Sequence, residues 1–310
     1  MAVPEVFAEL AGRVNNWGRW GDDDELGTLN LVDTVAVKRG AEAVQTGERI
    51  SLALPLHEDG IQTGLVPPGR QNPVHTVVQA NHRPHEDPDS VASSDDRLEL
   101  WLQAATHWDA LSHVSYRGHH YNGIPADVVT MEDGATRLGI EQVEALVSRG
   151  VLLDVARALG SERLEPGHAI TPADLDAALE LAGAQLEAGD IVLVRTGQMM
   201  LAHAGDRMGY LYPAPGLSMH CAPWFHGRDV AAVATDTIGL EVYPSELDDW
   251  SLPVHLLHLV EMGMLQGQNF DLEELAARCA SDDRYTFLLS APPEPVVGAF
   301  GAPVVPVAVR

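Results

Sequence analysis

The stretch from Leu102 to His113 concentrates residue types that bind metals and move protons. If this segment is extended, Gln103, His107 and Asp109 project from one face, because side chains along a strand alternate with a period of two. In a helix, Asp109 would instead point about 200° away from His107. An imidazole, a carboxylate and an amide oxygen together suit a divalent metal of borderline or hard character. The extended geometry therefore predicts a metal site formed by these three residues.

The same residues also have a purely structural explanation. Asp109 can cap a short helical turn from 110 to 114, which would bring His113 back over the site. In the structural explanation Asp109 is only that cap, His107 is a hydrogen-bonded core histidine and Gln103 is a strand residue at the surface. Spacing alone leaves both explanations open, because the pattern His-x-Asp is short and common.

The stretch resembles the motif of the cyclase-like metal-dependent hydrolases, a family that includes bacterial kynurenine formamidases and isatin hydrolases. The family pattern is His-x-Gly-Thr-His-x-Asp, followed four residues later by a histidine. The matching positions are Thr106, His107, Asp109 and His113. Gln103 replaces the first histidine and Ala105 the glycine, and both departures resemble a longer-chain subgroup. Other segments that resemble this subgroup are Asn16–Gly21, Asp24–Asn30, Tyr121–Gly123 and Ala234–Thr237.

This resemblance implies an architecture that spacing alone does not give. It implies an α/β fold of the swivelling β/β/α type, with a mixed sheet and flanking helices. A single domain would cover residues 1–310, with residues 1–30 as an N-terminal arm. The resemblance also implies a symmetric assembly, a homodimer or a homotetramer.

Periodicity, caps and turn residues predict the elements that position the motif. A strand from 97 to 102 would deliver it, after a long loop over 57–97 that is rich in Pro, His, Asp and Ser. Helices are expected at 5–14, 33–44, 140–148, 172–187, 253–261 and 271–279. Strands are expected at 49–54, 74–79, 151–156, 191–196, 230–234 and 285–290. From residue 137 onward, these elements alternate as in an α/β protein.

Two further residues take roles from the resemblance. A histidine at the position of His255 faces the metal site in the family, and a glutamate follows where this chain has Gln268. Relatives with two metals use that glutamate and the first motif histidine, and both are amides here. We therefore expect one divalent metal ion, and the carbonyl oxygen of Gln103 favours manganese while zinc is possible.

Aromatic residues near the motif and in the N-terminal arm are candidates for a substrate-binding wall. These residues are Trp17, Trp20, Trp108 and Tyr121, with Gln268 as a polar contact. For Trp17 and Trp20, packing of the arm on its own domain or across a dimer explains the sequence equally well. Asp236 and Glu241 follow a predicted strand, where carboxylates lie beside ligand sites or cap turns.

Composition limits the partners and the compartment. The chain has 310 residues with 45 acids against 19 bases, and its formal net charge is −26. Such an excess of acids argues against nucleic acid or an anionic membrane surface as a partner. Two cysteines are too few for a disulfide framework, and neither a signal peptide nor an apolar stretch long enough to cross a membrane is visible. We expect a soluble cytoplasmic protein that acts on a small molecule, aromatic or cyclic.

The predicted function is metal-dependent hydrolysis of an amide or lactone bond, in a cyclic amide, a lactone or a formamide. Gln103, His107 and Asp109 would hold the metal, His113 would act as the base, and His255 would orient substrate or stabilise the oxyanion. One alternative is a polyketide-type cyclase or dehydratase that uses the same metal. Another is a catalytically silent ligand-binding protein, because Gln103 and Gln268 weaken the donor set. The sequence contains no GxSxG, GxxxxGK[ST], GxGxxG or CxxC motif that would favour other chemistry.

Overall fold

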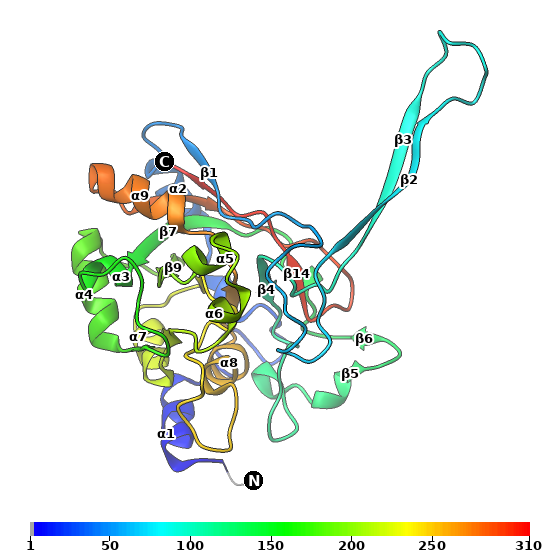
Figure 1. Ribbon diagram of the computed structural model, residues 1–310. Coiled ribbons are helices and arrows are strands. Elements are labelled where there is room, and N and C mark those ends of the chain that lie inside the picture. The colour runs from blue at the N-terminus through cyan, green and yellow to red at the C-terminus, as the bar shows by residue number, and fades with distance from the viewer. Residues whose placement is uncertain (1–2) are drawn as a thin grey trace.

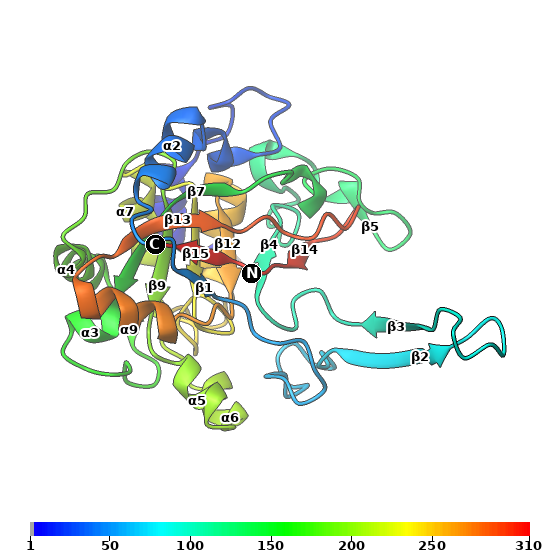
Figure 2. The same ribbon diagram turned by 90° about the horizontal axis from the view of Figure 1, so that it is seen from above.

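A computed structural model describes residues 3–310, and its centre is one mixed sheet of nine strands (Figures 1 and 2). Their order is β1 (Arg49–Ser51), β15 (Val307–Val309), β13 (Thr286–Ser290), β7 (Val147–Asp154), β9 (Ile191–Arg195), β11 (Ala232–Thr235), β12 (Leu265–Gln268), β4 (His107–Asp109) and β14 (Gly301–Pro303). The strands from β7 to β12 run parallel, and the neighbours on both sides are antiparallel. This arrangement confirms the predicted α/β fold with a mixed sheet.

Helices cover both faces of this sheet. The helices are α1 (Glu5–Val14), α2 (Thr34–Glu42), α3 (Val155–Ala158), α4 (Pro172–Ala182), α5 (Met199–His203), α6 (Arg207–Leu211), α7 (Ala222–His226), α8 (Pro253–His255) and α9 (Glu273–Asp282). A π-helical segment, η6 (Leu256–Met262), continues α8. Short 3₁₀ turns are η1 (Gly27–Leu31), η2 (Tyr121–Gly123), η3 (Ala126–Val128), η4 (Ile140–Gln142) and η5 (Met219–Cys221). Because parallel strands covered on both faces need apolar residues throughout, β9 and β11 are buried along their whole length.

Two hydrophobic clusters lie on opposite faces of the sheet. Val151 and Val192 belong to the cluster that includes α1, α4 and the α8–η6 helix, whereas Leu152 and Leu193 belong to the cluster with α9. This alternation follows from the two-residue period of β7 and β9. The motif strand β4 contributes Trp108 to the cluster with α9.

Several local predictions are confirmed by the backbone. Asp33 caps α2 by accepting hydrogen bonds from two backbone amides, and Thr171 caps α4 in a reciprocal capping box with Asp174. The N-terminal helix has its predicted bounds and buries Phe7 and Val14. The first two residues of the expected arm lie outside the described residues. The domain boundaries themselves stay a prediction.

Two predicted elements are wrong. Residues 140–148 form a short 3₁₀ turn and then enter β7, because the segment from Val147 onward pairs with β13. The strand expected at 97–102 does not deliver the motif. Instead β3 (Ser93–Glu99) pairs with β2 (Val74–His82) in a separate hairpin, and the chain reaches β4 through a turn.

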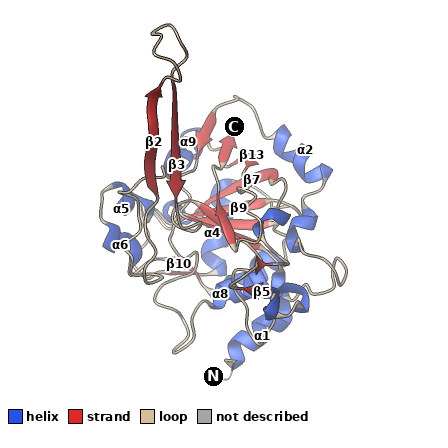
Figure 3. Ribbon diagram, turned by 90° about the vertical axis from the view of Figure 1, so that its right-hand side faces the viewer, coloured by secondary structure: helices blue, strands red, loops and turns tan. Residues whose placement is uncertain are grey.

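This β2–β3 hairpin points away from the body of the molecule (Figures 1 and 3). Every residue of β3 is exposed, and Val77 and Val78 of β2 are about three-fifths exposed, at 59% and 63%. The remaining paired segments are β5 (Val129–Thr130) with β6 (Gly134–Ala135) and β8 (Ala169–Ile170) with β10 (Gly216–Leu217). Within residues 3–310 no helix combines the length and the apolar character that a membrane crossing requires.

Candidate active site

Strand β4 places His107 and Asp109 on one face and Trp108 on the other. Within the sheet, His107 pairs with Gln268 and Asp109 with Gln266 on β12, while Asp109 pairs with Gly301 on β14. His107 and Asp109 are only 1% and 0% exposed. The predicted extended geometry is therefore confirmed for these two residues. They form the centre of a buried polar cluster.

The facing atoms of His107 and Asp109 have no hydrogen-bond partner. Nδ1 of His107 donates to the carbonyl of Ala105 at 2.8 Å, so in the neutral ring Nε2 is the nitrogen that presents a lone pair. This Nε2 lies 3.3 Å from Oδ1 of Asp109, and both atoms are buried and unpartnered. In the neutral ring this lone pair faces a carboxylate oxygen, and a cation between the two atoms would remove their repulsion. The spacing matches two ligands that are each about 2.0–2.2 Å from one divalent ion.

Amide side chains from β12 hold the other oxygen of this carboxylate. Nε2 of Gln268 donates to Oδ2 of Asp109 at 2.7 Å, and Nε2 of Gln266 donates to the same atom at 3.2 Å. Gln268 also lies 3.1 Å from Nε2 of His255. These contacts orient Asp109 so that Oδ1 stays free for an ion, as expected for residues that support a metal ligand.

His255 is tied to a carboxylate that the sequence did not assign to it. Its Nδ1 donates to Oε1 of Glu241, which also accepts the backbone N–H of His255 at 3.2 Å. Oε2 of Glu241 accepts the backbone N–H of Val254 at 3.3 Å. Its Nε2 lies 3.8 Å from Oδ2 of Asp109. Burial alone would lower the pKa of His255, but the charge and hydrogen bond of Glu241 raise it above the usual value.

His113 reaches the cluster from the turn that follows β4. Its backbone N–H donates to Ala110 at 2.9 Å, and its Nε2 lies 3.8 Å from Oδ1 of Asp109. The turn brings His113 over the site as expected, but residues 110–114 form no helix and the Asp109 side chain does not cap them. The Asp109 side chain is instead held by β12. His113 is the most exposed of the clustered imidazoles, at 23%.

The electrostatics of the cluster favour a charged carboxylate among imidazoles. Burial alone would raise the pKa of Asp109, but His113, His107 and His255 together hold it well below its usual value. Burial lowers the pKa of His113, and the charge of Asp109 only partly offsets this. Asp109 is thus an anion before any ion binds, which suits a metal ligand.

Gln103 does not share the strand with the other predicted ligands. Strand β4 begins only at His107. Gln103 lies before it, in a turn closed by a hydrogen bond from the backbone N–H of Ala104 to the carbonyl of Trp101. Its side chain nevertheless points toward β14, since a Cβ built at Gly301 would lie 3.0 Å from its Nε2. Within residues 3–310 no three His, Cys, Asp or Glu side chains are grouped as a metal site. The role of Gln103 as a third ligand stays a prediction.

The structure does not bring the predicted aromatic wall to this cluster. Trp108 is fully buried against Phe270 and donates to the carbonyl of Ala291, because it occupies the opposite face of β4. Tyr121 is also fully buried and donates to Asp24 at 3.0 Å. A side chain without exposed area cannot contact substrate in this conformation. The wall role predicted for these two residues is corrected to core packing.

The tryptophans of the N-terminal arm are also held elsewhere. Trp17 donates to the carbonyl of Val260 at 2.7 Å, on the far part of η6. Trp20 lies under the guanidinium of Arg19, whose carbon is 4.6 Å from the ring centre. Packing of the arm on its own body therefore explains Trp17, and the substrate role of Trp20 stays a prediction.

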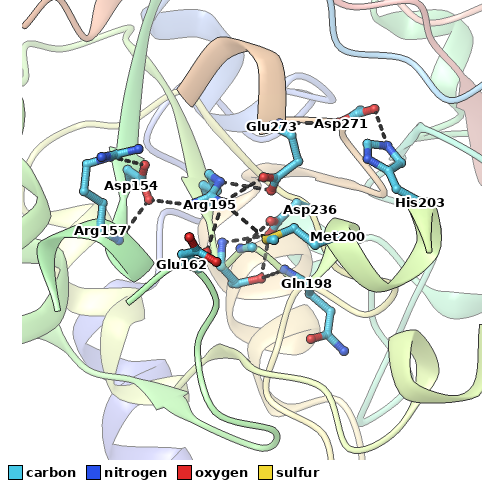
Figure 4. Close-up of polar contacts among 12 residues, drawn as sticks. Asp154, Arg157, Glu162, Arg195, Gln198, Met200, His203, Asp236, Asp271 and Glu273 are labelled. Carbon is cyan, nitrogen blue, oxygen red and sulfur yellow. Dashed lines mark hydrogen bonds and ion pairs between the residues drawn. The ribbon is translucent and has the colours of Figure 1, made fainter. Parts of the chain in front are cut away.

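Asp236, the other carboxylate after β11, has a structural role. It accepts hydrogen bonds from the backbone N–H and hydroxyl of Thr196 and from the amide of Gly197, at 2.7–2.9 Å. Beside it, Arg195 pairs with Asp154 and Glu273 (Figure 4). These contacts lock the carboxyl ends of neighbouring strands together.

Sequence reasoning missed Gln266 and left Glu241 without a role. A signal for Gln266 was present, since Gln266 and Gln268 are two amides with a period of two, but no strand over Leu265–Gln268 was predicted. Buried amides need partners, so a shared anion was the natural inference. Glu241 gave no such signal, because its contact with His255 depends on how two loops meet.

Comparison with known proteins agrees with this geometry. Residues 50–242 match a family model described as "Putative cyclase". A solved structure described as a novel cyclase is 38% identical, with a TM-score of 0.89 over 97% of this chain and 99% of that chain. Isatin hydrolase A from Ralstonia solanacearum is 20% identical, with a TM-score of 0.60 over 84% and 91% of the two chains. Isatin hydrolase A from Labrenzia aggregata is 18% identical, with a TM-score of 0.61 over 87% and 96%.

These last two likenesses concern the fold alone. No curated protein matches the sequence. The family match covers more than half of the chain, includes the motif strand and the loop that carries Glu241, and agrees with the 38% identical structure. The chain belongs to the cyclase family, the family of cyclase-like metal-dependent hydrolases whose motif is carried by strand β4.

Proposed function

We propose that this protein is a hydrolase that uses one divalent metal ion to cleave an amide or lactone bond. The observation that carries the proposal is the pair of buried, unpartnered acceptor atoms, Nε2 of His107 and Oδ1 of Asp109, 3.3 Å apart. When bound there, a divalent ion supplies a Lewis acid that lowers the pKa of water and polarises a carbonyl. The substrate would be a small cyclic amide, a lactone or a formamide.

His113 is the residue placed to move protons. It lies at the more open side of the cluster, and its Nδ1 has no partner among the described residues. In the proposed reaction it accepts a proton from the attacking water and delivers it to the leaving nitrogen or oxygen. Its contact with Asp109 keeps the ring facing the reacting water.

His255 is placed to stabilise negative charge that develops on the substrate oxygen. Glu241 holds its Nδ1 and favours the charged ring, so Nε2 can donate toward an oxyanion. Nε2 of Gln268 donates to Asp109 and lies 3.1 Å from Nε2 of His255, so Gln268 packs between the two groups and fixes their positions. Its role would be positioning, with substrate contact as a second possibility for its remaining oxygen.

The choice of metal follows from the donor set. One imidazole, one carboxylate and an amide oxygen from Gln103 are harder donors than the thiolates or multiple imidazoles that favour zinc. We therefore propose manganese as the preferred ion. Full activity of the zinc-loaded protein together with inactivity of the manganese-loaded protein would contradict this choice.

The first experiment measures metal content per chain by elemental analysis on protein purified without chelator. We expect one equivalent in the parent and none in the His107→Ala/Asp109→Ala variant. His82→Ala, which removes an exposed histidine of the hairpin, is the matched control and keeps the metal. No metal in the parent, even after incubation with manganese or zinc, would refute the mechanism and favour a silent binding protein.

A second measurement assigns His113. Its replacement by alanine should lower turnover by roughly 10²–10⁴ if it is the general base, with metal content unchanged. Unchanged turnover of the metal-loaded variant would remove His113 from the mechanism.

The description of the matched family favours one second candidate, a lyase or cyclase on a polyketide-like substrate. The same cluster would then polarise a carbonyl for dehydration or ring closure. Reaction in ¹⁸O-labelled water separates the two candidates, because only hydrolysis places solvent oxygen in the product.

A further inference from the structure

The loop that precedes the β2–β3 hairpin is fastened to the motif. Nε2 of Gln62 donates to the carbonyl of Ala104 at 2.7 Å, and Gln62 is only 4% exposed. Asn72 closes the loop. Its side-chain oxygen accepts from the backbone N–H of Gln62 at 2.8 Å, and its side-chain nitrogen donates to the backbone carbonyl of Gln62 at 3.2 Å. The residues between them are therefore held in a fixed position relative to the metal ligands.

Arg70 lies on this fastened loop and has no counter-ion. Its Nη1 makes one long hydrogen bond, 3.4 Å, to the backbone carbonyl of Gln103, and its Nε is buried without a partner. Among residues 3–310 no carboxylate lies within ion-pair distance of its guanidinium, unlike Arg195 or Arg149. Arg70 also lines a hollow of about 450 Å³, which gives it access to small molecules.

Arg70 nonetheless contacts the segment that carries the motif. Its guanidinium lies against the backbone carbonyl of Gln103, the predicted third ligand, and its loop is tied to Ala104, three residues before His107. The guanidinium therefore lies beside the predicted ligand set. A half-buried cation with unpaired N–H donors costs free energy unless an anion accepts hydrogen bonds from those donors.

We propose that Arg70 binds a carboxylate group carried by the substrate, next to the bond that is cleaved. This inference rests on the proposed function for its location, because it takes the His107–Asp109 cluster as the reaction site. A planar guanidinium with unused N–H groups matches a carboxylate in two parallel hydrogen bonds. The substrate class is thus an anionic amide or lactone, in which this carboxylate takes no part in the bond changes.

The primary test measures binding of 2-aminobenzoate and 2-aminobenzamide, two ring compounds of nearly equal shape that differ in charge. Isothermal titration calorimetry on the parent should give roughly tenfold or more tighter binding of the benzoate, as expected for a charge-assisted pair. Arg70→Met should abolish this preference and leave the benzamide affinity within about twofold. Arg70→Lys should retain part of it, since the charge remains but the paired geometry is lost.

Several results would overturn the proposal. They are equal or absent binding of both probes by the parent, and an unchanged preference in Arg70→Met. The variant is compared with the parent for melting temperature and metal content, so that misfolding is recognised. If the methionine variant fails to fold, Arg70→Lys decides the test. In that variant the binding of 2-aminobenzoate must become weaker while the binding of 2-aminobenzamide stays unchanged.

Kinetics distinguish a carboxylate carried by the substrate from one formed in the reaction. With 2-formamidobenzoate and formanilide as substrates, Arg70→Met should raise KM only for the charged compound. Equal losses with both compounds would mean that Arg70 acts on the reacting group, which contradicts the proposal. Failure of the proposed function is recognised separately, since a protein without metal or turnover can still be tested for the Arg70-dependent binding.

Discussion

Replacement of Gln268 by glutamate is the sharpest probe of the cluster. Nε2 of Gln268 lies 2.7 Å from Oδ2 of Asp109, and the two residues are 4% and 0% exposed. In Gln268→Glu a carboxylate oxygen would take the place of the donor. Two carboxylates would then face each other at hydrogen-bond distance inside the protein.

The expected cost has two parts. The hydrogen bond to a charged acceptor that is lost is worth about 1.5–3 kcal/mol. Two unit charges 2.7 Å apart repel by about 6 kcal/mol at an effective dielectric constant of 20, an upper bound that relaxation of the side chains reduces. Without metal, we expect the free energy of unfolding to fall by about 3–6 kcal/mol at pH 8.

The assay is urea unfolding in EDTA and again with excess manganese. Gln268→Met serves as the matched control, because it loses the hydrogen bond without adding charge and should cost only about 1.5–3 kcal/mol. Manganese should stabilise the glutamate variant more than the methionine variant, since the ion neutralises the paired carboxylates. Parent-like stability of Gln268→Glu in EDTA would refute the contact with Asp109, and equal effects of manganese on both variants would refute the metal site.

Three further predictions concern other parts of the molecule. Glu241→Gln should lower kcat roughly 10–100-fold with metal content unchanged, because it removes the charge behind His255; unchanged kcat would contradict that role. Burial raises the pKa of Asp236 from 3.8 to about 6, so its contribution to stability is complete below pH 4 and is lost as pH rises through 6. Urea unfolding between pH 4 and pH 8 should therefore show a loss about 3 kcal/mol larger in the parent than in Asp236→Asn, and equal losses would contradict the shift. Because a lone hairpin is marginally stable, β2–β3 should pack in a homodimer or homotetramer; removing residues 77–96 should lower the mass seen by sedimentation velocity, and a monomeric parent would contradict this.

Local sequence rules predicted the elements whose structure depends on a few neighbouring residues. Asp33 and Thr171 begin helices because their side chains satisfy the free amides of the first turn, whatever packs around them. The segment 140–148 has helical periodicity but forms only a short 3₁₀ turn before β7 begins at Val147, since pairing of β7 with β13 outweighs local propensity. That pairing joins residues more than a hundred positions apart, and sequence patterns do not encode it.

For the site too, local sequence rules predicted some residues correctly and failed where the structure depends on distant segments. Alternation along β4 places His107 and Asp109 together, and applied consistently it also sends Trp108 to the opposite face, into the core. The motif therefore contained the evidence against Trp108 as a substrate wall. For Gln103 the alternation argument required a strand four residues longer than β4, and a turn before His107 ended it.

The supporting residues of the site come from distant segments, and this explains why they escaped sequence analysis. Gln266 and Gln268 reach Asp109 only because β12 pairs antiparallel with β4, and Glu241 reaches His255 only because the loop after β11 meets the start of α8. Yet each of them satisfies an atom that would otherwise be a buried, unpaired polar group. The requirement that buried polar atoms find partners thus predicts that such residues exist. By the same requirement, the unpaired atoms on His107, Asp109 and Arg70 are the ones to which the proposed ion and the proposed anionic substrate would bind.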